Sequence, residues 1–138
     1  MIVMAVIAIL LALAIPSFRA MQQEAKNEKA KGGIRTLKMA VQSYYNNYGD
    51  VYPPGSGTST WEPYLISAYP QIINAPIYDP FAANNTTQFG YKLSPSSKYF
   101  IIFSVGSRGT GIASINNSGN AFITGDAIWE SNGPMGGN

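Results

Sequence analysis

Residues 1–48 read MIVMAVIAILLALAIPSFRAMQQEAKNEKAKGGIRTLKMAVQSYYNNY, and this stretch predicts one long helix with two different halves. Residues 1–15 carry no charge, no polar side chain, no glycine and no proline. At about 1.5 Å per residue, a helix over the whole stretch would extend roughly 70 Å, far longer than the helices of an ordinary small domain. The rest of the chain is too short to bury such a rod. The apolar half therefore needs a membrane or other copies of the chain.

The first half of this helix, residues 1–18, is predicted to be a membrane or assembly segment. A membrane span normally needs about 20 apolar residues, so the segment falls somewhat short of one. Arg19 stands where a charged side chain would mark the water interface. Pro16 predicts a kink or a locally melted stretch over residues 12–16. The residues expected to enter lipid or a packed assembly are Met1, Ile2, Val3, Met4, Val6, Ile7, Ile9, Leu10, Leu11, Leu13, Ile15, Pro16 and Phe18.

A secretory signal peptide is the alternative interpretation of this apolar start. Residues 12–14, Ala-Leu-Ala, resemble a small-x-small cleavage site, and the length of the apolar run fits. A signal peptide also has a basic region before its apolar run, and none is present here. The pattern therefore favours a retained helix.

The second half of the helix carries a single apolar stripe. Gly32 and Gly33 each cost about 1 kcal/mol in a helix interior, but the helix is expected to continue because apolar residues resume at once with helical spacing. The stripe should pack against the rest of the chain, although its tyrosines could instead form an aromatic track along a filament. Its residues are Ile34, Leu37, Val41, Tyr44, Tyr45 and Tyr48.

Residues 49–138 are predicted to form a small globular head. The loop 49–60 is rich in glycine and proline, and a short helix over 60–69 follows, with Ser59 or Thr60 as its N-cap. Period-two patterns and short apolar runs predict strands at 89–94, 98–105, 120–125 and 126–129, the first two joined by a tight turn. Residues 131–138 read as a flexible or surface-lying tail. The expected fold class is α+β, with a long protruding helix packed on a small antiparallel sheet.

Composition argues against an enzyme. The chain has no cysteine and no histidine, which excludes disulfides and thiolate metal sites and removes the commonest general base. Its seven carboxylates are scattered, and the glycine-rich residues 106–111 (GSRGTG) lack the lysine of a phosphate-binding loop. We therefore expect no catalytic activity and no obligatory cofactor.

Charge is unevenly placed along the chain. Residues 1–48 carry six basic and two acidic side chains, a net charge of +4, whereas the head carries a net charge of −2. The basic run from Lys26 to Lys38 could contact nucleic acid or anionic lipid, but a solvated helix surface is the preferred interpretation. No nucleic acid is expected to bind the head.

The long helix resembles the N-terminal helix of type IV pilins and type II secretion pseudopilins. The match includes Pro16, Phe18 and Arg19, a proline followed shortly by a bulky apolar residue and an arginine. In the head, VYPP (51–54), DPF (79–81), FGYKLS (89–94), YFIIFSVGSRGTG (99–111) and GDAIWE (125–130) are similar, in this order, to features of the major pseudopilin subgroup. By this resemblance Met1 falls about six residues after the family's mature start. The family's N-methylated first residue and buried glutamate would then precede the present sequence.

The resemblance implies a structural subunit of a helical filament. Copies would wait in the bacterial inner membrane through residues 1–18 and then be extracted into a filament whose core is formed by these apolar segments. Minor pilin or pseudopilin subunits and an assembly machinery are the implied partners. A periplasmic pseudopilus acting in protein export is preferred, since many pilins close a C-terminal loop with a disulfide that this chain cannot form. An extracellular type IV pilus, for adhesion, twitching motility or DNA uptake, and a membrane-tethered binding module stay open as alternatives.

The resemblance also implies a calcium-stabilised loop near the C-terminus. Asp126 is the best matching ligand position. Arg108 stands where the family pattern places an aspartate, and the loop 112–125 contains no acidic residue. Calcium requires several hard oxygen ligands, so a loop held by hydrogen bonds alone is the competing expectation.

Overall fold

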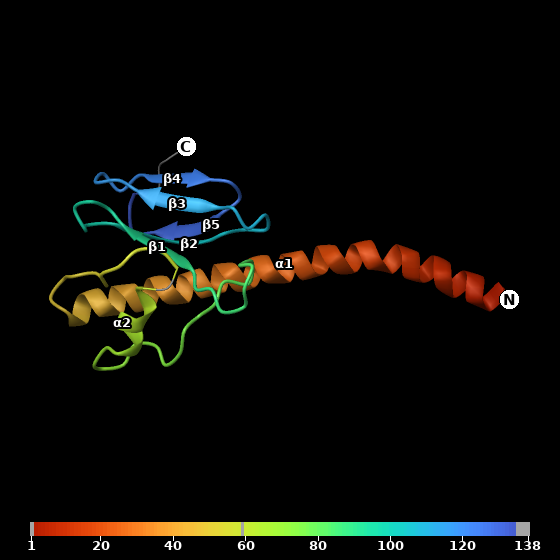
Figure 1. Cartoon of the computed structure of the whole chain (residues 1–138), viewed down its shortest axis with the longest axis horizontal. Coiled ribbons are helices and arrows are strands. Elements are labelled where there is room, and N and C mark those ends of the chain that lie inside the picture. The colour runs from red at the N-terminus through yellow and green to blue at the C-terminus, as the bar shows by residue number, and fades with distance from the viewer. Residues whose placement is uncertain (1, 59, 135–138) are drawn as a thin grey trace.

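The computed structural model describes residues 2–58 and 60–134, and it shows the α+β arrangement expected from the sequence. The helix α1 (Ile2–Asn47) is followed by the short helix α2 (Glu62–Ile66). Five strands complete the head: β1 (Gly90–Leu93), β2 (Phe100–Ser104), β3 (Ile112–Ile115), β4 (Ala121–Thr124) and β5 (Ile128–Ser131). Figure 1 shows α1 as a rod whose second half lies along the head and whose first half projects beyond it.

The helix runs without interruption through both positions that could have broken it. Residues 12–16 are helical, so the expectation of a locally melted stretch is wrong, and the ribbon instead bends gently in its projecting half (Figure 1). Gly32 and Gly33 also lie inside the helix, as expected. At Gly33 the absent side chain has a structural role, because the Phe89 ring occupies the space that a Cβ would need.

The head has three layers. The antiparallel sheet β1–β2–β5 lies between α1 on one face and the β3–β4 hairpin on the other (Figure 1). In the register of this sheet Tyr91 lies opposite Ile102, which lies opposite Glu130 on its other side. Strand β2 is therefore covered on both faces, which explains its uninterrupted apolar run Phe100–Phe103.

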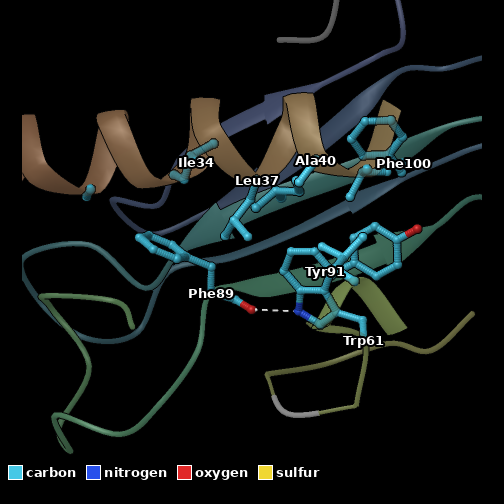
Figure 2. Packing of buried hydrophobic residues seen from close by; sticks show 11 residues of the cluster. Ile34, Leu37, Ala40, Trp61, Phe89, Tyr91 and Phe100 are labelled. Atoms are coloured by element: carbon cyan, nitrogen blue, oxygen red, sulfur yellow. Dashed lines mark hydrogen bonds between the residues drawn. The ribbon is translucent and has the colours of Figure 1, made fainter. Parts of the chain in front are cut away.

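The main core lies between α1 and the sheet. Ile34 and Leu37 of the helix pack near the rings of Phe89, Tyr91 and Phe100 (Figure 2). Trp61, at the start of α2, closes the core from the side, and its indole Nε1–H donates a hydrogen bond to the carbonyl oxygen of Phe89 at 3.0 Å. A second, smaller cluster on the far face of β2 consists of Ile101, Phe103, Ala113, Ile115 and Ala121.

Four details of the head differ from the sequence-based expectations. The helix α2 begins at Glu62 without a side-chain cap, because the hydroxyl of Thr60 instead donates to the carbonyl oxygen of Ser56 at 2.9 Å. Ser59, the other expected cap, lies outside the described residues. Strand β3 was not expected at all, and β5 begins two residues later than predicted. Of the predicted tail, Ser131 belongs to β5, and residues 135–138 lie outside the described part of the chain.

Candidate assembly surface

The apolar segment, residues 2–18, is a continuous uncovered hydrophobic surface. Every side chain in it is exposed, and the buried positions of α1 begin only at Ala30. Even the bulky side chains stay in solvent, with Ile2 82% and Phe18 62% exposed. All the predicted assembly residues lie on this projecting part of the rod except Met1, which is outside the described residues (Figure 1).

The apolar character of this segment extends around the whole helix circumference. A soluble surface helix normally has one polar face, whereas a helix that is apolar all round is buried in a large core or in lipid. Residues 2–18 span roughly 25 Å at about 1.5 Å per residue, close to the hydrocarbon thickness of about 30 Å. By length and composition α1 could anchor the chain in a membrane.

The stretch between the apolar segment and the head is polar and mostly solvated. Two ion pairs are formed by the described residues: Lys31 with Glu28 at 3.3 Å, and Lys38 with Glu130 at 3.4 Å. The first lies within the helix surface, and the second joins the helix to β5 of the head. Exposed pairs of this kind contribute about 0–1 kcal/mol each. The basic run therefore lies mainly in solvent, and within the described residues its long-range ion pair is the one between Lys38 and Glu130.

The predicted packing stripe lies on the head-facing side of α1, with its burial decreasing toward the C-terminal end. Ile34, Leu37 and Val41 are fully buried, and Tyr44 and Tyr45 are half-buried. Tyr48, just past the helix end, is 37% exposed. Its ring stacks on Tyr44 with centroids 4.2 Å apart, and its hydroxyl oxygen accepts a hydrogen bond from the backbone N–H of Tyr69 at 2.8 Å.

Small residues complete the stripe, and the spacing of the large apolar residues alone did not predict them. Ala30 and Ala40 are buried in the same core, and Gly33 receives the Phe89 ring. These positions let the helix backbone approach the sheet closely. Their helical spacing relative to Ile34 and Leu37 was the signal that could have found them.

Asp126 accepts hydrogen bonds from the turn that precedes β3. Its Oδ2 accepts the hydroxyl of Ser107 and, at 2.9 Å, the backbone N–H of Arg108, while Oδ1 is buried without a partner. The Ser107 hydrogen bond is the main reason that the pKa of Asp126 lies below its ordinary value. Among the described residues no group of three or more acidic side chains gathers here or elsewhere. Ca²⁺ takes six to eight oxygen ligands, so this arrangement fits it poorly, and calcium binding stays a prediction from the resemblance alone.

Two buried carboxylates were not singled out from the sequence. Asp79 accepts from the hydroxyl of Ser104 at 2.7 Å and from the backbone N–H groups of Val105 at 2.9 Å and Phe81 at 3.0 Å. It thereby fixes the loop before β1 to the end of β2. Glu62 is fully buried, and its Oε2 accepts the N–H of Ile77 at 2.9 Å while Oε1 has no partner. Burial raises the pKa of Glu62 to about 7.

Comparison with known proteins finds no match. No protein-family model, no curated protein and no solved structure matches the chain. The chemistry of the projecting helix and the head therefore has to carry any functional conclusion.

Proposed function

We propose that this protein is a structural subunit that polymerises through residues 2–18 into a helical filament of the type IV pilus kind. The observation that carries the proposal is the complete exposure of an all-round apolar helix that projects from a folded head (Figure 1). The likeness of the helix sequence to pilins and pseudopilins supports the same conclusion.

Exposure of this apolar surface to water is energetically costly. A soluble monomer rarely exposes a continuous apolar patch larger than a few hundred Å², so the segment must be covered in the functional state. Each Å² removed from water contributes about 25 cal/mol, and a bulky side chain about 1.5–3 kcal/mol. Lipid covers the segment before assembly, and neighbouring copies cover it in the filament. Because both environments are apolar, the exchange between them changes hydrophobic stabilisation little and leaves packing between helices to decide it.

The division of α1 into two parts suits this role. The half from Ala30 onward is fixed to the head by the core, so the head travels as a rigid unit with its helix. The polar stretch from Arg19 to Lys29 lies between the apolar segment and this half, with its side chains in solvent. Heads would therefore stand outside a core formed by the apolar segments, separated from it by roughly two to three helical turns.

A periplasmic pseudopilus of a type II secretion system is the preferred form of this filament. It is supported by the order of motifs in the head and by the absence of any cysteine for a C-terminal disulfide. An extracellular type IV pilus would use the same helix and the same assembly.

Electron microscopy of material sheared from the native cells tests the proposal, with the major band identified by mass spectrometry. Long surface filaments built from this chain would establish a pilus. A chain confined to the envelope, together with loss of protein secretion on its deletion, would establish the pseudopilus. The proposal is wrong if overexpression yields no filaments and if a chain whose apolar segment is replaced by an unrelated membrane anchor keeps its full cellular function. The chain would then be a tethered module.

A further inference from the structure

A groove of about 630 Å³ lies at the end of the head farthest from the apolar segment. One wall is the C-terminal end of α1 and the loop that follows it, with Tyr45, Asp50 and Tyr52. The other wall is the β1–β2 turn, residues 94–99 (Figure 1). Volumes of about 300–1,000 Å³ are typical of small-molecule sites. Filament assembly through residues 2–18 gives this groove no role.

Two left-handed turn positions lie at this groove. Asp50 has φ 61° and Ser97 has φ 56°, and they are the non-glycine residues with positive φ in the described part of the chain. One lies on each wall of the groove. Asp50 follows the left-handed Gly49 at the end of α1, and its backbone N–H donates to the carbonyl oxygen of Tyr45 at 3.0 Å. Ser97 closes the β1–β2 turn by donating its backbone N–H to the carbonyl oxygen of Ser94 at 2.8 Å, so hydrogen bonds fix the shape of both walls.

The polar groups at the groove are arranged to meet a neutral ligand with many hydroxyls. Asp50 offers two acceptor oxygens and Lys98 offers three donor hydrogens, and the two side chains form no ion pair with each other in the described structure. Their charges cancel, which disfavours a phosphate or another anion. A single carboxylate is too little for a divalent cation. Ser96 and Ser97 add hydroxyls that can both donate and accept.

The remaining lining is aromatic and aliphatic. The rings of Tyr45 and Tyr52 stack with centroids 4.4 Å apart, and Tyr99 lies on the opposite wall. Tyr52 also packs on Phe100, with centroids 5.0 Å apart, so its faces are taken up within the head. The ring of Tyr99 and the side of Tyr45 away from Tyr52 are left to attract the weakly positive C–H groups of a pyranose ring, while its hydroxyls meet Asp50 and Lys98. An acyl chain would leave these polar groups unpaired. We propose that the groove between residues 45–54 and 93–99 binds a neutral saccharide.

Saturation-transfer-difference NMR on the full chain tests this, in a detergent without a sugar headgroup. The probes are maltose, cellobiose, lactose and N,N′-diacetylchitobiose, each at millimolar concentration. We expect at least one to receive saturation through its ring C–H protons and to shift the resonances of Tyr45, Tyr52 and Tyr99. No transfer to any of the four would overturn the proposal. So would a proline-rich peptide that binds the groove when the sugars do not.

Three substitutions locate the binding. Lys98→Met and Asp50→Asn each remove one charged partner, and each is expected to weaken the best sugar at least five-fold. Asparagine tolerates the left-handed conformation of Asp50, so this variant keeps the loop shape. Lys92→Met on β1 lies outside the groove and is the matched control, with an unchanged dissociation constant expected. Equal affinity in all three variants would place any sugar binding elsewhere and contradict the assignment.

Discussion

The ring of Phe89 lies against the backbone of α1 at Gly33, so closely that a Cβ placed on Gly33 would stand 2.8 Å from Phe89 Cε2. Phe89 is fully buried, and its carbonyl oxygen is held by the indole of Trp61. The ring therefore cannot move aside freely. This one contact explains why a costly glycine lies in the middle of a long helix, and it fixes the distance between the helix and the sheet.

Substitution of the two neighbouring glycines should have opposite effects. Gly33→Ala is expected to lower the free energy of unfolding by up to about 2 kcal/mol, because overpacking of about 1–3 kcal/mol exceeds the gain of about 1 kcal/mol in helix propensity. Gly32→Ala is expected to raise it by about 1 kcal/mol, since nothing lies within 4 Å of its added Cβ. Denaturant unfolding of both variants in detergent measures this. Equal shifts would show that the Phe89 contact does not limit the helix.

The buried carboxyl of Glu62 is expected to make the fold less stable as pH rises. Burial raises its pKa from 4.5 to about 7, so the folded state keeps a proton that the unfolded state releases between these values. Stability contributed by the protonated group is complete below about pH 4.5 and is lost as pH approaches 7. The total is roughly 3 kcal/mol at about 1.4 kcal/mol per pKa unit.

Glu62→Gln imitates the protonated acid and should remove this dependence. We expect unfolding free energies of the variant at pH 5 and pH 8 to differ by much less than those of the wild type. Glu24→Gln, at an exposed position of α1, is the control and should keep the wild-type slope. A wild-type protein with equal stability at both pH values would show that Glu62 is solvated in the folded state.

Asp79 holds the loop before β1 against the end of β2, and this local clamp needs a carboxylate rather than an amide. Its Oδ2 accepts the N–H of Val105, and an amide NH₂ at that place would leave this N–H unpaired. Asp79→Asn is therefore expected to destabilise the fold by about 1–3 kcal/mol. The same change at exposed Asp50, whose carboxylate makes no hydrogen bond in the described structure, should alter stability by less than about 0.5 kcal/mol. Similar losses in both variants would contradict the clamp.

The long helix and the head could be predicted because their patterns are strong and local. Fifteen uninterrupted apolar residues and a resumed stripe at Ile34, Leu37 and Val41 indicate one helix whatever the tertiary context. Strand β2 was equally visible, since a strand covered on both faces is apolar throughout. The alternation of β4 also predicted a strand, and its hairpin partner could have been sought just before the turn.

What could not be predicted depends on contacts between distant segments. Strand β3 reads Ile-Ala-Ser-Ile, is four residues long and is defined by its pairing with β4. The burial of Glu62 and Asp79 follows from loops that close over them, for which the sequence has no periodic signal. The groove near Tyr45 and Lys98 likewise joins a helix end to a turn more than forty residues away.

The apolar segment gives the most direct prediction, because one charge should separate assembly from folding. Leu11 is 59% exposed in the middle of the segment, where a lysine costs about 2.5–3.5 kcal/mol in lipid and more if buried without a partner between copies. L11K should reduce sheared filaments at least ten-fold, while near-ultraviolet circular dichroism of the head is unchanged, since no head residue contacts this part of α1 in the described structure.

Met39→Lys is the matched control: it is 62% exposed on the same helix, opposite the core, and should assemble normally. Filaments of normal abundance from L11K would mean that the apolar segments do not form the filament core, and A8E would then be expected to assemble as well. Loss of filaments from both L11K and Met39→Lys would instead place the contact between heads, and the packing of residues 2–18 would no longer be the driving interaction.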